Sequence, residues 1–220
     1  MEISTLAQDR RRFIKSQSQR RKAGIVASAC AEASTHAPAG ACPARLTIWR
    51  KSLLFNGNGY TVYNDLDGRL VFRVDNYACD WREEMFLMDY AGNVLFTIRR
   101  CRKKLSISGS WEAFRGDREV LGCGADHEKP LIKATKMLGN PSCKLTVATR
   151  DEYRMKWSGH DGWSKIYRTT AGTSPVAEVS RKSGAASESF LGKDVLTLTV
   201  QPGIDQAMIM AMVMINDAMR

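Results

Sequence analysis

Metal-binding and disulfide patterns are absent from this chain of 220 residues. Its cysteines form no C-x-x-C pair, and none of its three histidines stands in a metal-ligand spacing with them. No apolar segment of the secretory type follows Met1, so we expect free thiols in a reducing compartment. We expect each cysteine to pack in the interior: Cys30, Cys42, Cys79, Cys101, Cys123 and Cys143.

Catalytic motifs are missing as well. Residues 57–59 are glycine-rich but lack the spacing and the following helix of a phosphate-binding loop. His160 lies in a glycine-flanked turn, and the acidic residues around His127 have no nucleophile motif beside them. Asp65 and Asp67 alone do not make a calcium-binding loop. The sequence therefore predicts a protein without enzymatic activity or cofactor and without a recognisable metal site, while calcium binding stays an open alternative.

Positive charge is distributed unevenly along the chain. The net charge is +10, and residues 1–45 contribute half of it with eight Lys/Arg against three Asp/Glu. Two basic runs, at 10–12 and 20–22, precede a stretch rich in Ala, Ser, Pro and Gly. Little of this could bury a core, so we expect residues 1–44 to form a disordered tail. An organelle transit peptide and a nuclear-import signal remain alternative interpretations of that tail.

The most apolar segment lies near the C-terminus, where residues 207–215 are nine apolar residues without a break. Their Ala and Met content favours a helix over about 204–219, with Asp205 near its positive end. A helix that is apolar all round must be enclosed, and nine residues span about 14 Å against about 30 Å of bilayer hydrocarbon. Enclosure by protein is therefore favoured for the residues Ile204, Ala207, Met208, Met210, Ala211, Met212, Val213, Met214 and Ile215.

From Leu46 onward, the chain alternates between apolar and polar residues. This period of two predicts half-buried antiparallel strands, clearest at 69–75, 93–99, 143–147 and 196–200. Residues 64–68 and 89–93 have the composition of tight hairpin loops. We therefore predict a mainly β fold for residues 45–220: a closed antiparallel barrel with the C-terminal helix in its lumen. Closure would also remove the exposed strand edges.

Several motifs resemble those of the plant LURP-one-related family, over roughly residues 45–219. The segments that carry the likeness are 46–55, 59–63, 70–77, 87–89, 95–100, 103–106, Trp111, 192–196 and 200–207. The resemblance implies a tubby-like fold, which is a twelve-stranded antiparallel barrel around a central hydrophobic C-terminal helix. It also implies kinship with phospholipid scramblases and with phosphoinositide-tethered tubby proteins proposed to act in transcription, and an association with plant defence.

Basic residues make up the candidate site. Five cations occupy six positions at the expected end of a strand, and a smaller pair lies upstream: Arg99, Arg100, Arg102, Lys103, Lys104, and Arg50 with Lys51. Such a cluster could hold phosphates or an anionic lipid head group, at about 1 kcal/mol for each charge near the surface. The alternative is a solvated hairpin that keeps a β protein soluble.

The tryptophans offer a second candidate site, because indole rings can stack on nucleic-acid bases. Their positions on or beside predicted strands favour packing in the core or at the barrel ends instead: Trp49, Trp81, Trp111, Trp157 and Trp163.

The leading hypothesis is a monomeric adaptor that contacts anionic phospholipid head groups, such as phosphoinositides, in plant defence or stress signalling. We expect it in the cytoplasm or nucleus, or peripherally at the plasma membrane. A nucleic-acid-binding or transcription-linked module is the alternative. A scramblase-like membrane protein is the second alternative.

Overall fold

The structure is a computed structural model. It describes residues 42–50, 59–79, 82–101, 110–116, 129–137, 139, 141–148, 151–158, 163–170, 172–182 and 194–219, with the backbone alone at 76–79 and 82–83. The predicted tail lies outside these residues except for 42–44, and β1 already begins at Ala44.

Within the described residues the chain forms twelve strands followed by one helix. The strands are β1 (Ala44–Trp49), β2 (Gly59–Asn64), β3 (Leu70–Cys79), β4 (Arg82–Asp89), β5 (Val94–Cys101), β6 (Ser110–Arg115), β7 (Ile132–Lys136), β8 (Ser142–Val147), β9 (Glu152–Trp157), β10 (Ser164–Arg168), β11 (Ala177–Arg181) and β12 (Val195–Val200). The helix is α2 (Gln206–Met219).

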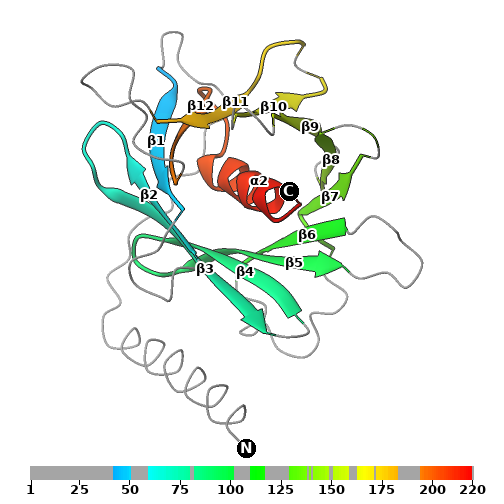
Figure 1. The fold of residues 1–220 in the computed structure, drawn as a ribbon, viewed down its shortest axis with the longest axis horizontal. Helices are drawn as coiled ribbons and strands as arrows, with labels where there is room; N and C mark the ends of the chain where they lie inside the picture. The colour runs from blue at the N-terminus through cyan, green and yellow to red at the C-terminus, as the bar shows by residue number, and fades with distance from the viewer. Residues whose placement is uncertain are drawn as a thin grey trace, which may run out of the picture. The chain divides into compact units, whose positions relative to one another are not determined.

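The strands form a closed antiparallel barrel in which each strand pairs with its neighbours in sequence. The ring closes between the first and last strands, with a register that runs from Ala44 opposite Val200 to Trp49 opposite Val195. Figure 1 shows α2 inside this ring, with its C-terminal end toward the viewer. The predicted closed barrel around a C-terminal helix is confirmed.

Alternation places one face of each strand in the lumen. In β8, Cys143, Leu145 and Val147 are buried, while Lys144 and Thr146 between them are exposed. The expected hairpin at residues 64–68 joins β2 to β3, and Gly68 adopts the positive φ of 68° that the turn requires. The inward faces meet the helix and form one continuous core.

Helix α2 is enclosed along most of its length. All side chains from Ile209 to Asn216 are buried, and Ile204, Ala207 and Met208 pack partly buried at its N-terminal end. Enclosure was therefore predicted correctly. No helix in the described part of the chain has both the length and the apolarity to cross a membrane.

Two packing predictions were partly wrong. Trp111 and Trp157 are buried as expected and Trp163 is half-buried, but Trp49 is 45% exposed. Trp49 directly follows the inward-facing Ile48, so alternation turns it outward. Trp81 lies outside the described residues.

Burial also differs among the cysteines. Cys143 is buried and Cys101 partly buried, but Cys42 is exposed, because it precedes the first strand and faces no core. All three thiols are free. Nothing is described of the side chain of Cys79 or of Cys30 and Cys123. The turn residues around His127 and His160 are outside the described ranges.

Candidate anion-binding end of the barrel

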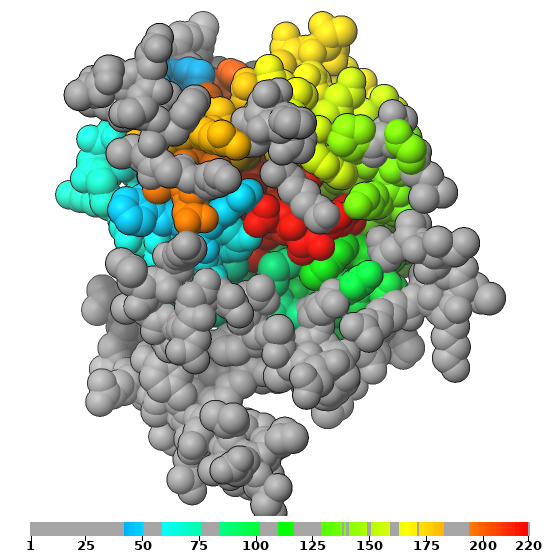
Figure 2. Space-filling model, viewed as in Figure 1, coloured from blue at the N-terminus to red at the C-terminus, as the bar shows by residue number. Residues whose placement is uncertain are grey.

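Helix α2 ends at one opening of the barrel, which we call the helix-exit end. The odd-numbered strands run toward this end. Four of these strands end alike: the last inward-facing apolar side chain is followed, two residues later, by a basic residue that continues the inward face. We call these four residues the basic rim: Arg50 after Ile48, Arg100 after Ile98, Lys136 after Ala134, and Arg181 after Val179. Figure 2 shows the helix, in red, reaching the surface at this opening.

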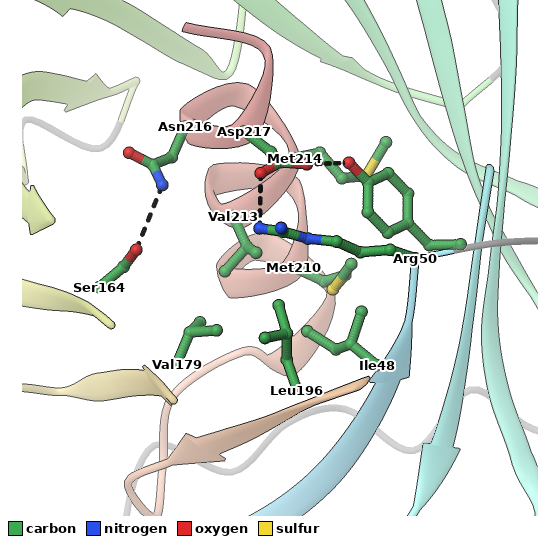
Figure 3. Close-up of a pocket in the computed structure, with 11 residues that line it drawn as sticks. Ile48, Arg50, Ser164, Val179, Leu196, Met210, Val213, Met214, Asn216 and Asp217 are labelled. Carbon is green, nitrogen blue, oxygen red and sulfur yellow. Dashed lines mark hydrogen bonds and ion pairs between the residues drawn. The ribbon is translucent and has the colours of Figure 1, made fainter. Parts of the chain in front are cut away.

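Arg50 ties the helix to the barrel wall. Its Nη2 atom donates to Oδ1 of Asp217 at 2.7 Å, and the hydroxyl of Tyr60 on β2 donates to the other carboxylate oxygen (Figure 3). A carboxylate in the last turn of a helix is repelled by the negative end of the helix dipole. The guanidinium and the phenol offset this repulsion, because both donate hydrogen bonds to Asp217.

Lys136 binds the helix terminus itself. The last carbonyl groups of a helix have no partner within the helix, and cations there are favoured by the dipole. The Nζ atom of Lys136 donates to the carbonyl oxygen of Met219 at 2.9 Å. Part of the basic rim thus stabilises the fold, whatever else it binds.

A small cavity lies at this opening, among the described residues. It is lined by the Arg50–Asp217 pair and Tyr60, together with Ser164 and Asn216, and below them by core side chains. Its volume is about 10 Å³ for the centre of a water-sized sphere. A site of that size holds about one water molecule. This cavity is therefore too small for an organic ligand.

Asn216 was not anticipated as a core residue. Its side chain is 3% exposed, and its Nδ2 atom donates to Oγ of Ser164 on β10 at 3.3 Å (Figure 3). Its Oδ1 atom has no hydrogen-bond partner among the described residues, which is costly for a buried oxygen. The polar contact nevertheless links the helix to β10.

The structure brings only some of the predicted cations together. Arg50 and Arg100 share the helix-exit end, but Arg99 faces outward, with its guanidinium 4.7 Å from the ring centre of Phe114. The other predicted cations, Lys51, Arg102, Lys103 and Lys104, lie outside the described residues. Lys136 and Arg181 were missed, although each continues the alternation of its strand by one more inward position.

The described residues include no group of three or more His, Cys, Asp or Glu side chains placed to hold a metal ion. What the helix-exit end offers chemically is positive charge around a helix terminus. Such an arrangement can attract an anion.

Comparison with known proteins gives one consistent family. A sequence model described as LURP-one-related matches residues 44–217. Protein LURP-one-related 8 of Arabidopsis thaliana is 38% identical over 175 residues, which cover 79% of this chain and 86% of that protein. Protein LURP-one-related 12 of the same plant is 34% identical over 178 residues, covering 78% and 76%.

The fold also matches a solved structure. The X-ray structure of a protein from Arabidopsis thaliana aligns with a TM-score of 0.56 and 19% identity, covering 80% of this chain and 91% of that one. At this identity the match concerns the fold alone. From the family match and the sequence identities, the chain belongs to the LURP-one-related family.

Proposed function

We propose that this protein is a non-enzymatic adaptor that contacts anionic phospholipid head groups, such as those of phosphoinositides, through the basic rim. The observation that carries the proposal is the gathering of four inward-facing basic positions, Arg50, Arg100, Lys136 and Arg181, at one end of the barrel. The small cavity at this end, about 10 Å³ among the described residues, is consistent with a head group that contacts the rim from outside.

Charge arithmetic sets the expected strength. Four cations at about 1 kcal/mol each give on the order of 4 kcal/mol, which corresponds to a Kd of about 1 mM. Arg50 and Lys136 already bind the helix, so their share is smaller. Binding through the rim alone should therefore be weak, reversible and sensitive to salt.

Vesicle co-sedimentation tests the proposal. The variant Arg100→Glu/Arg181→Glu reverses two rim charges and leaves in place Arg50 and Lys136, which donate hydrogen bonds to α2. We expect it to lose binding to phosphoinositide-containing vesicles, while the wild type binds them and leaves phosphatidylcholine vesicles unbound. The matched control is Arg69→Glu/Arg115→Glu, two cations that are 84% and 64% exposed at the other end of the barrel.

Two outcomes would reject the proposal that the basic rim binds lipid head groups. One is unchanged vesicle binding by the rim variant. The other is an equal loss in the control, which would mean that net charge alone matters. A chain lacking residues 1–41 provides a further comparison. Loss of vesicle binding in that chain would assign the binding to the basic tail.

The place of this activity in plant defence or stress signalling is proposed from the family. A scramblase-like role has no support in the described residues, because α2 is enclosed by the barrel. A nucleic-acid role finds support on another surface, the outer face of β8, β9 and β10.

A further inference from the structure

The outer face of strands β8, β9 and β10 contains an unusual arrangement of charge. Lys144 on β8 lies directly opposite Arg154 on β9, and Lys156 on β9 lies directly opposite Lys165 on β10. Like charges at directly opposed positions of an antiparallel pair are destabilising. Two such pairs on neighbouring strands are therefore a cost to the fold.

Elsewhere in the same barrel, opposed residues on the outer face carry charges of opposite sign. On the outer face of β4 to β7, the directly opposed residues alternate in sign: Glu84, Arg99, Glu112 and Lys133. Local rules of this kind are most often broken at functional sites. The like-charge pairs thus point to a function of the β8–β10 face, which we define as Lys144, Arg154, Lys156 and Lys165 with Trp163 and Tyr167.

Among the described residues, carboxylate partners are found for Lys144 and Lys165, which lie on the two outer strands of this face. Lys144 is 2.6 Å from Glu152, and Lys165 is 3.4 Å from Glu178. Arg154 forms no ion pair with any residue that the structure describes. Lys156 lies over the ring of Tyr167 at 5.6 Å, and both it and Arg154 are exposed. The centre of the face thus presents two uncompensated cations to solvent.

The spacing makes these charges act together. Neighbouring strands are about 4.8 Å apart, and alternate residues along a strand are about 6.6 Å apart. Arg154 and Lys156 are therefore closer than the Debye length of about 8 Å at physiological salt. Regular strands hold them, so little ordering is needed when an anion binds.

We infer that the β8–β10 face binds single-stranded nucleic acid through its phosphates. The face is an open sheet surface, which suits a chain of phosphates better than a single enclosed head group. Trp163 and Tyr167 are partly exposed beside the cations, and Lys165 lies 5.6 Å from the ring centre of Trp163. Cations interleaved with aromatic rings are the usual elements of a single-strand site.

A bilayer suits this face less well. Peripheral insertion uses large apolar side chains that project from the surface. The most exposed ones described, Leu66 at 91% and Tyr90 at 75%, lie on the β2–β3 and β4–β5 hairpins, away from this face.

Fluorescence anisotropy with a labelled single-stranded oligonucleotide tests the inference on the full chain. The variant Arg154→Gln/Lys156→Gln removes two charges at exposed positions and keeps side-chain length. We expect the Kd to rise about tenfold and the slope of log K against log salt to fall in magnitude by about 1.4, at about 0.7 for each phosphate that is no longer neutralised. The matched control, Arg69→Gln/Arg115→Gln, should change neither quantity.

An unchanged slope in the first variant, or an equal change in the control, would overturn the inference. The inference would also be overturned if Arg154→Gln/Lys156→Gln kept its Kd for the oligonucleotide but no longer bound anionic vesicles. The β8–β10 face would then bind lipid. The proposed rim function is judged separately, since Arg100→Glu/Arg181→Glu should leave oligonucleotide binding intact.

A second variant separates function from folding. Lys156→Glu replaces a repulsive pair with an attractive one opposite Lys165. We expect its melting temperature to rise while its affinity for the oligonucleotide falls. A fall in both would mean that the loss of binding reflects damage to the fold, and would overturn the inference.

Discussion

Asp205 caps the N-terminus of α2. Its Oδ1 atom accepts hydrogen bonds from the backbone N–H groups of Ala207, at 2.9 Å, and Met208, at 3.1 Å. Loss of such a cap typically costs about 1 kcal/mol. We expect Asp205→Ala to lower the free energy of unfolding by about 1 kcal/mol in urea denaturation. Asp205→Asn keeps the acceptor and should be nearly neutral; equal destabilisation by both would show that the cap contributes little.

Cys143 is a second residue with a specific chemical expectation. Burial raises the pKa of its thiol to about 12. The reactive form of cysteine is the thiolate, which is therefore almost absent at pH 8. In the native protein, we expect iodoacetamide to modify exposed Cys42 well before Cys143, as measured by peptide mass spectrometry. Equal rates would contradict the burial of Cys143.

At the scale of elements, α2 is the core around which the strands pack. Met210 is fully buried among inward-facing side chains. An unpaired charge there would cost an amount comparable to the whole stability of a domain, about 5–15 kcal/mol. We expect Met210→Asp to abolish cooperative thermal unfolding, measured by circular dichroism. The control Ala218→Asp adds the same charge at an exposed position of the same helix and should remain folded.

If Met210→Asp stays folded with an unchanged melting temperature, α2 cannot be the core of the barrel. The variant could also fold with the new carboxyl protonated, because burial raises the pKa of a carboxyl group. Its melting temperature would then fall with increasing pH.

At the scale of the whole molecule, the barrel is closed by pairing between residues far apart in sequence. Beside the β1–β12 seam, the Nζ atom of Lys182 donates to Thr47 and to Asp65, and Nε of Arg45 lies 3.5 Å from Asp65. The hydrogen bond from Lys182, followed by that from Thr47, lowers the pKa of Asp65 below its usual 3.8. The ionised carboxylate thus contributes to closure.

Asp65→Asn tests this contribution. A lowered pKa stabilises the folded state above the ordinary carboxyl pKa, and the effect is lost as pH falls through the lowered value. We expect the variant to be less stable than the wild type by about 1–2 kcal/mol at pH 7. The difference should shrink below about pH 4. A difference that is independent of pH in urea denaturation would show that charge at Asp65 is not responsible.

Much of the fold could be predicted from short segments. The unbroken apolar run of α2 requires an enclosure, and alternation in β8 or β12 identifies strands before any partner is known. Arg50 and Arg100 were recognised from local charge alone. Lys136 and Arg181 were not, because a single basic residue at the end of a strand is ordinary until its inward position is known.

The remaining features depend on register. Lys144 and Arg154, like Lys156 and Lys165, are unremarkable along the chain, and only the pairing of β8, β9 and β10 sets them opposite each other. Strand type and helix enclosure follow from side chains within a few residues of one another, whose periodicity is a local property. Which charges become neighbours depends on the register between paired strands, which the pattern of a single strand does not contain. Closure of the barrel adds the pairing of residues far apart in sequence, as where Ala44 lies opposite Val200.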